Sequence, residues 1–138
     1  KYSYKAVERT VDLAGPAEAE VTLLTVLEEV QTEDYDIPIV SKRGQLEDLL
    51  RQKKQKVESE GRQILNAADR YFEGSGIVVN KVLRKGSPAD IICDYADSND
   101  FDLIVLGVRG KDGIKRYLMG SIADKVVRHA NTSVMIVK

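Results

Sequence analysis

The sequence has almost no residues that can cross-link a protein, and its net charge is close to zero. Its 138 residues include a single cysteine, three prolines and no tryptophan. One cysteine excludes an intramolecular disulfide framework and fits a reducing compartment. The 21 Lys and Arg residues nearly balance the 22 Asp and Glu residues, so no overall basic field favours nucleic acid or an anionic membrane. Any anion site must therefore be local.

Long apolar runs are also absent. Runs such as residues 103–106 are far too short to span a membrane, and residues 1–10 lack the apolar stretch of a secretion signal. We therefore expect a cytoplasmic protein without a membrane partner. A chain of this length is expected to form one domain, residues 1–138, which buries roughly two-thirds of the surface that it exposes when unfolded.

Two segments have the apolar spacing of amphipathic helices. The first covers residues 3–14 and is expected to stop at Gly15-Pro16, and the second covers residues 45–72, with Gly61 as a weak point. Residues 31–44 lack periodicity and predict a loop. A basic run in the second helix alternates with glutamine and precedes two glutamates, which predicts a solvated helix face; the run comprises Arg51, Lys53, Lys54 and Lys56.

Strand patterns alternate with the helical ones. The nearly continuous apolar, β-branched run over residues 19–27 is typical of a central strand that is covered on both faces. Polar residues interleaved in residues 77–83 indicate an edge strand. Residues 101–106 predict a second buried strand, and residues 133–137 predict the last one. Strands that alternate with helices imply an open parallel α/β sheet.

Two further helices begin with capping patterns. Ser87 is expected as the N-cap of one helix, with Pro88 at the first helical position and Asp90 in the first turn. The same pattern recurs at Ser121, at the start of a helix predicted over residues 121–130. Capping alone could therefore explain Ser121.

The segment over residues 107–121, which reads GVRGKDGIKRYLMGS, is rich in glycine. It follows a predicted strand, and ligands of open α/β sheets bind beyond the carboxyl ends of the strands. Gly107 would end the strand, Gly110 would allow a turn with positive φ, and Gly120 would precede a helix N-terminus whose free N–H groups attract anions. Local positive charge comes from Arg109, Lys111, Lys115 and Arg116. These features predict a phosphate site, although such glycines can also serve only as turns.

The glycine spacing fits neither of two common phosphate loops. A Walker loop requires a lysine between its last glycine and the Ser or Thr, and none stands between Gly120 and Ser121. The glycines also do not follow the G-x-G-x-x-G order of dinucleotide sites. The pattern is instead G-x-x-G, nine residues, then G-S. It resembles the signature of the ATP-binding subgroup of the universal stress protein family. The similarity covers nearly the whole chain, including the segments KGSPADIICDYA, FDLIVLGVRG and MGSIADKVVRHANTSVMIVK.

The resemblance implies a fold like that of the adenine nucleotide alpha hydrolases. This fold is an open, parallel five-stranded sheet in the order 3-2-1-4-5, with helices on both faces. The family begins with a strand in the centre of the sheet, whereas this chain begins at the helix that follows it. We therefore expect that the first strand is missing from residues 1–138. We also expect that a preceding stretch supplies it, because without this strand the backbone groups of two buried strands would be unpaired.

The resemblance also implies ATP, carried with Mg²⁺, as the ligand. The glycines and Ser121 would contact the phosphates and the ribose, with the backbone amides of Ile122 and Ala123 nearby. Val26, at the end of the first apolar strand, would pack on adenine or else belong to the core. The expected binding residues are Gly107, Val108, Arg109, Gly110, Lys111, Gly120, Ser121, Ile122, Ala123 and Val26.

The leading hypothesis is thus an ATP-binding stress-response or signalling module with at most slow ATP hydrolysis. The resemblance also implies a homodimer through the last strand, residues 133–137. Two alternatives stay open: a hydrolase or transferase acting on adenine nucleotides, which requires clustered carboxylates, and a dimeric partner-binding module that needs no nucleotide. No catalytic residue or metal ligand is assigned, because the only histidine, His129, is expected at a helix C-terminus in a charge or solvent role.

Overall fold

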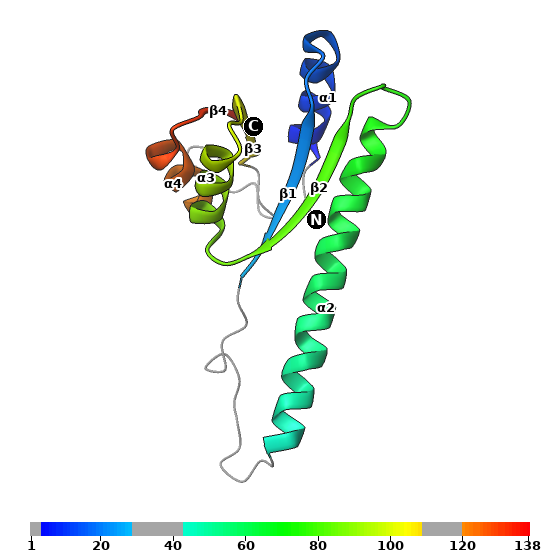
Figure 1. Cartoon of the computed structure of the whole chain (residues 1–138), viewed down its shortest axis with the longest axis vertical. Helices are drawn as coiled ribbons and strands as arrows, with labels where there is room; N and C mark the ends of the chain where they lie inside the picture. Colours follow the sequence, from blue (N-terminus) through cyan, green and yellow to red (C-terminus); the bar gives the residue numbers. More distant parts are fainter. Residues whose placement is uncertain (1–3, 29–42, 109–119) are drawn as a thin grey trace.

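The computed structural model describes residues 4–28, 43–108 and 120–138. Helices and strands alternate through these ranges (Figure 1), which confirms the predicted α/β class. Gly44, predicted to lie in a loop, is already helical, and most of that predicted loop falls outside the described residues. The elements are α1 (Lys5–Ala17), β1 (Val21–Leu27), α2 (Arg43–Asp69), the 3-10 turn η2 (Arg70–Phe72), β2 (Val79–Lys85), α3 (Pro88–Ser98), β3 (Leu103–Gly107), α4 (Ser121–His129) and β4 (Ser133–Val137).

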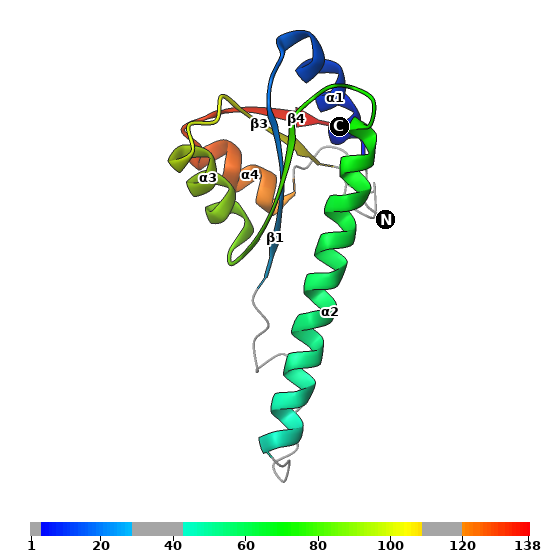
Figure 2. The ribbon, with the colours of Figure 1, turned by 45° about the vertical axis from the view of Figure 1, so that its right-hand side comes forward.

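The strands of the described ranges form two separate parallel pairs instead of one sheet. β1 pairs with β2 from Val21↔Val79 to Leu27↔Lys85, and β3 pairs with β4 along the full length of both strands. No strand pairing among these residues joins β1 to β3. Among the described residues, both β2, predicted to be an edge strand, and β1, predicted to be central, have a strand partner on one side only. The two pairs are also turned relative to one another, since β1 and β2 run along the long axis and β3 and β4 run across it (Figure 2).

Each strand pair has its own apolar cluster. α1 and the turn η2 cover β1 and β2, where Ala14, Val21 and Phe72 are buried. α3 and α4 cover β3, and the members of that cluster include Ala96 and Val126. The core therefore follows the division of the strands into two pairs.

α1 extends past the glycine and proline that were predicted to stop it. The helix ends at Ala17, with Pro16 inside its last turn and Glu18 as a left-handed C-cap at φ 54°. A proline disfavours helical backbone at the residue before it, through clashes with that residue's N–H and Cβ. Gly15 has no side chain, so the helix continues through the pair for one more turn.

Gly61 is a close-contact position in the middle of α2. A Cβ atom built on Gly61 would lie 3.0 Å from Leu83 Cδ1 and 3.1 Å from Leu27 Cδ2. The glycine therefore lets α2 lie directly on β1 and β2. The expected weak point in helix propensity is what allows this packing.

We predict that Gly61→Val destabilises the protein by about 1–3 kcal/mol, because the added methyl groups overpack this contact. Gly44→Val is the matched control in the same helix, since a Cβ at Gly44 meets nothing within 4 Å among the described atoms. Urea unfolding followed by circular dichroism gives both free energies. Equal stability of the two variants would contradict the packing role of Gly61.

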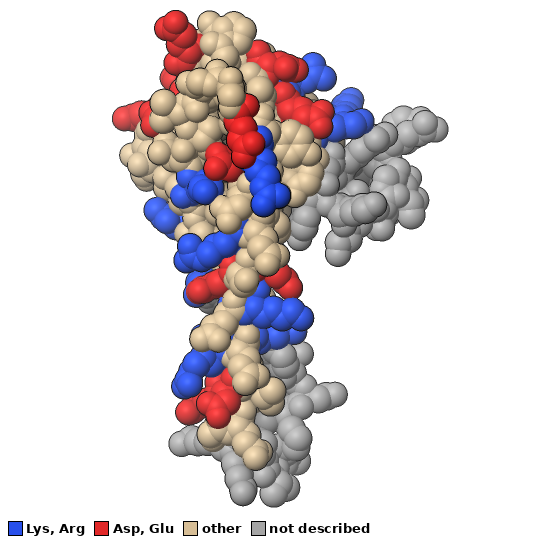
Figure 3. Space-filling view, turned by 90° about the vertical axis from the view of Figure 1, so that its right-hand side faces the viewer, with Lys and Arg blue, Asp and Glu red and all other residues tan. Residues whose placement is uncertain are grey.

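The outer face of α2 carries mixed charge, as predicted (Figure 3). Arg51 lies 3.6 Å from Asp48, and the lysines of the basic run are exposed. Two ion pairs join the helix to β2: Lys85 binds Glu58, and Lys81 Nζ lies 3.5 Å from Asp69. The hydrogen bond and the charge of Lys85 lower the pKa of Glu58. Because both partners of each pair are partly exposed, these ion pairs contribute little to stability.

Candidate functional site

The turn that follows β2 is hydrogen-bonded to the carboxyl end of β1 and leads into α3. Gly86 follows β2 at φ 140°, and its N–H donates a hydrogen bond of 2.9 Å to Leu27 O at the end of β1. A Cβ at Gly86 would lie 3.2 Å from Ile91, so a side chain here would be strained by both the backbone and the neighbour. Ser87 is the N-cap of α3 and Pro88 begins the helix, as predicted, although the Ser87 side chain makes no capping bond.

Gly107 and Gly120 differ from Gly86 because the described fold does not require glycine at either position. Neither has positive φ. A Cβ at Gly107 would make an ordinary contact of 3.6 Å with Ala6, and one at Gly120 would meet nothing within 4 Å among the described atoms. Both glycines are exposed, and they flank residues 109–119. The described packing therefore does not explain why these two positions have no side chain.

At the N-terminus of α4, the capping residue is not Ser121. Gly120 is the N-cap and Ser121 is the first helical residue, so capping, the alternative explanation of Ser121, does not account for this serine. The Asp124 N–H already donates to Gly120 O at 3.0 Å, while no side chain caps the helix. An N-cap residue needs extended backbone, and Gly120 supplies it at φ −60° and ψ 157°. The Ser121 hydroxyl is therefore not used for capping.

The first turn of α4 presents backbone donors. The amides of Ser121, Ile122 and Ala123 precede the first helical hydrogen bond, so helix geometry gives them no acceptor within α4. Ala123 is buried, whereas Ser121 and Ile122 are exposed. The Asp124 carboxylate accepts hydrogen bonds from Arg128 Nε at 3.1 and 3.2 Å, one turn further along. The acid of the first turn is thus paired away from the helix end, where a free carboxylate would repel an anion.

The other expected binding residues are placed as follows. Val108 is half-buried, and its N–H donates to Val137 O at 3.2 Å, so this amide serves the β3–β4 pair. Val26 is half-buried in β1 and pairs with Arg84. Arg109, Gly110 and Lys111 lie outside the described residues.

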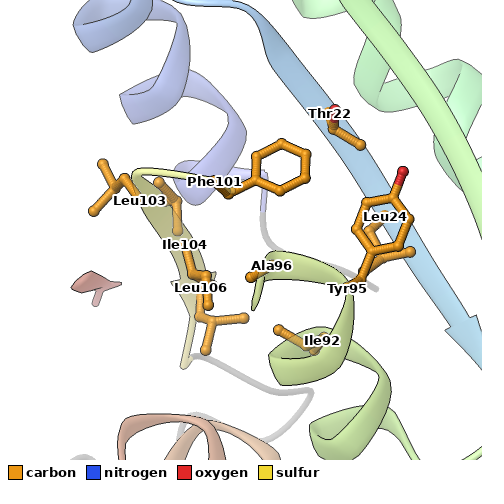
Figure 4. Close-up of a pocket in the computed structure, with 10 residues that line it drawn as sticks. Thr22, Leu24, Ile92, Tyr95, Ala96, Phe101, Leu103, Ile104 and Leu106 are labelled. Atoms are coloured by element: carbon orange, nitrogen blue, oxygen red, sulfur yellow. The ribbon is translucent and has the colours of Figure 1, made fainter. Parts of the chain in front are cut away.

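No local sequence pattern indicates a cavity between the two strand pairs, although the strand order implied by the family resemblance has a gap there when its first strand is missing. A cavity of about 140 Å³ lies between β1 and β3, against α3 (Figure 4). Thr22 and Leu24 line it from β1, residues 103–106 from β3, and Tyr95 is among the lining residues of α3. The Arg84 guanidinium lies 5.4 Å from the centre of the Tyr95 ring. No local pattern could have indicated this cavity, because its walls are brought together only by the tertiary fold.

Titratable groups of the described ranges give little support for metal or thiol chemistry. No group of three or more His, Cys, Asp or Glu side chains there could hold a metal ion. Burial, followed by the nearby Asp94 and Asp90, raises the pKa of Cys93, which disfavours a reactive thiolate. His129 is exposed in the last turn of α4, as predicted. Across the same ranges, no helix is long and apolar enough to cross a membrane.

Sequence comparison identifies the family. The profile of the Universal stress protein family matches residues 1–138. The chain belongs to this family. A universal stress protein of Methanothermobacter thermautotrophicus is 30% identical over 141 residues, covering 100% of this chain and 89% of that protein. The universal stress protein YxiE of Bacillus subtilis is 32% identical over 137 residues, covering 99% of this chain and 90% of that one.

Solved structures have the same fold as this universal stress protein. The protein MJ0577 superposes with a TM-score of 0.72 at 24% identity, covering 97% of this chain and 88% of that chain. The universal stress protein of Archaeoglobus fulgidus in complex with dAMP gives 0.67 at 22%, covering 100% and 91%. A universal stress protein in complex with cAMP gives 0.66 at 23%, covering 98% and 86%. These likenesses confirm the α/β fold.

Proposed function

We propose that this universal stress protein binds ATP at the carboxyl end of β3 and the N-terminus of α4, as a stress-response or signalling module with at most slow hydrolysis. One observation carries the proposal. Gly107 and Gly120 flank residues 109–119 without any need for glycine in the described packing, and Gly120 leads into a helix end without a side-chain cap. Close approach of a phosphate to the backbone explains both features, because a side chain would occupy the phosphate position.

The bound ligands of the structural neighbours support an adenine nucleotide. The neighbours were solved with dAMP and with cAMP, which share the adenine ring and a phosphate. On this chain, the amides of Ser121, Ile122 and Ala123 would donate to the phosphates, with the Ser121 hydroxyl beside them. Val26 would pack on the adenine ring.

The loop residues complete the proposed site. By their place in the signature, Arg109, Gly110 and Lys111 would surround the phosphates from the glycine-rich loop. Mg²⁺ would enter with ATP and be held mostly by phosphate oxygens and water, as is usual for this ion. That mode of binding fits a site that needs no cluster of protein carboxylates.

The fold and assembly are proposed to follow the same family pattern. We infer one domain over residues 1–138 and a five-stranded order, 3-2-1-4-5, in which β1 and β2 are the second and third strands and β3 and β4 are the fourth and fifth. The first strand would then lie between β1 and β3. We also propose a cytoplasmic homodimer through β4. Support comes from the pairing of β4 with β3 alone among the described strands and from its short apolar sequence.

Calorimetric titration of Mg-ATP, compared with Mg²⁺ alone, tests the binding site through Gly120→Val. We expect binding near a Kd of about 1 μM, or −8 kcal/mol, and a loss of at least about tenfold in the variant. Urea unfolding should show a loss of stability of no more than about 1 kcal/mol, because a Cβ at Gly120 meets no described atom and only the N-cap preference for glycine over valine is lost. Gly44→Val, at an open position remote from α4, is the control and should bind normally.

Two results would overturn the nucleotide site. Equal affinity of wild type and Gly120→Val would remove Gly120 from the site. No binding by wild type, in a protein that unfolds cooperatively, would leave the glycines as turn residues. The better account would then be a dimeric partner-binding module, which the open edge and apolar sequence of β4 favour.

A further inference from the structure

Two tyrosines from distant parts of the chain stack on one another. The ring centres of Tyr4, at the start of α1, and Tyr71, in η2, lie 5.2 Å apart, with 25° between the ring planes. Tyr4 is half-buried and Tyr71 is 41% exposed, so reagents in solution can reach the pair. Neither ring belongs to the proposed nucleotide site.

The packing beneath the pair sets this arrangement. Val11 of α1 packs against the buried cluster that contains Phe72, the residue after Tyr71. At the start of α1, the Glu8 N–H donates to Tyr4 O at 2.9 Å and so holds the Tyr4 backbone in place. The apolar core therefore brings the two rings together, and their proximity does not depend on the ring contact alone.

Two phenols at this separation can react with one another once they are oxidised. The sequence contains no tryptophan, so tyrosine is the aromatic side chain of this protein that loses an electron most easily. A phenol that has lost one electron and one proton is a radical, with the unpaired electron shared by the ring carbons next to its oxygen. Stacked rings need only small side-chain rotations to bring two such carbons into contact, and held proximity of this kind strongly favours reaction within the molecule.

Other oxidisable side chains of the described ranges are placed differently. Tyr95 contacts Phe101, with ring centres 5.7 Å apart, and phenylalanine has no phenol to oxidise. Cys93 is half-buried and packs against the second apolar cluster, around Val126. Tyr4 and Tyr71 thus combine exposure with a phenol partner, whereas Tyr95 has no such partner.

We propose that Tyr4 and Tyr71 are a site of oxidative cross-linking, at which hydrogen peroxide and a one-electron oxidant of the haem peroxidase class convert the stacked pair to a dityrosine. Each phenol gives up one electron and one proton, and one hydrogen peroxide takes up both electrons and both protons to form two molecules of water. One C–C bond then forms between the ring carbons next to the two hydroxyls. Each of these carbons loses its hydrogen as a proton, and each phenol oxygen regains one.

The cross-link joins the start of α1 to η2 and closes a long loop, since β1 and α2 lie between the two tyrosines in the sequence. A covalent link of this kind stabilises a fold by restricting the unfolded chain, and the effect grows with the length of the loop. It also fixes α1, whose Ala6 lies 3.6 Å from a Cβ built on Gly107. Oxidising conditions thereby make the protein harder to unfold.

The test treats the whole chain with a plant haem peroxidase and hydrogen peroxide, without nucleotide. We expect dityrosine fluorescence in the monomer band of a denaturing gel, with a yield that stays constant over about a tenfold range of protein concentration. After trypsin, mass spectrometry should find the peptide that ends at Lys5 joined to residues 71–81, with two hydrogen atoms lost. The urea midpoint of the cross-linked protein should rise by at least about 1 M.

Tyr71→Phe is the matched control, because phenylalanine keeps the stacked ring but has no phenol. Tyr4→Phe is the second variant, since Tyr2 lies in the same tryptic peptide as Tyr4. Each variant should lose at least about tenfold of the fluorescence in the monomer band. Tyr95→Phe removes a phenol elsewhere in the fold and should leave the yield unchanged. Circular dichroism confirms that all three variants are folded.

Three results would overturn the cross-linking site: links that form mainly between molecules, a wild-type yield in either variant of the pair, or joined residues other than Tyr4 and Tyr71. An unchanged urea midpoint after complete cross-linking would overturn its effect on stability. Failure of ATP binding would alter none of these readouts.

Discussion

Replacing Val126 by aspartate should unfold the protein, whereas the same change at Val127 should leave it folded. Val126 is 0% exposed, in the cluster that joins α4 to α3 and β3, and Val127 is 43% exposed on the same helix. A buried carboxylate without a partner loses its hydration and also leaves part of the apolar volume empty. We expect a loss of more than about 4 kcal/mol at Val126, out of a typical total of 5–15 kcal/mol, and less than about 1 kcal/mol at Val127.

Urea unfolding followed by circular dichroism measures both variants at neutral pH. Val126→Ala is a milder second variant that introduces no charge and should remain folded with lower stability, by about 1–3 kcal/mol. Because both aspartates change the helix propensity of α4 similarly, their difference reports burial alone. Cooperative unfolding of Val126→Asp near the wild-type midpoint would contradict the position of Val126 in the core.

The sequence predicts best where a local signal and the tertiary environment agree. Residues 133–137 were predicted as a strand and form β4. The Ser87-Pro88 pair was predicted to begin a helix and begins α3. A short apolar run and a capping pattern are both local signals within a few residues, so neither depends on the rest of the fold.

The sequence predicts less well where two local signals compete or where distant segments meet. Ser121 has the residue type of an N-cap, but Gly120 takes that position with extended backbone. Pro16 has the residue type of a helix stop, but it fits within the last turn of α1 after a glycine. The division into two strand pairs could not be read from any window, since strand pairing is set by segments far apart in the chain.

The candidate site divides in the same way. Glycine spacing predicted a phosphate loop that includes Gly107 and Gly120. The structure gives an independent reason to distinguish these two glycines from Gly86. Gly86 has positive φ and a close neighbour, whereas Gly107 and Gly120 have neither. Spacing alone cannot make this distinction, because it depends on backbone conformation and on contacts across the fold. The glycines that the described packing does not need are those that the nucleotide proposal uses.

Ser121→Glu should raise the stability of the protein and at the same time abolish nucleotide binding. Ser121 is the exposed first residue of α4, so a carboxylate there interacts favourably with the helix dipole, by about 0.3–1 kcal/mol. In the proposed site the same carboxylate lies beside the phosphates and repels them. We expect at least about a 100-fold loss of Mg-ATP affinity, equal to about 2.7 kcal/mol. Calorimetry measures the affinity, and urea unfolding measures the stability.

Ser121→Gln is the matched control, since glutamine has nearly the same shape as glutamate without the charge. It removes the hydroxyl contact but adds no repulsion, so it should lose less affinity than Ser121→Glu and gain no helix-dipole stabilisation. The difference between the two variants should also shrink at high salt, because mobile ions screen an exposed carboxylate. Opposite signs for stability and affinity cannot arise from partial unfolding, which lowers both. If the Ser121→Glu and Ser121→Gln variants bind ATP equally well, the phosphates do not lie at the N-terminus of α4.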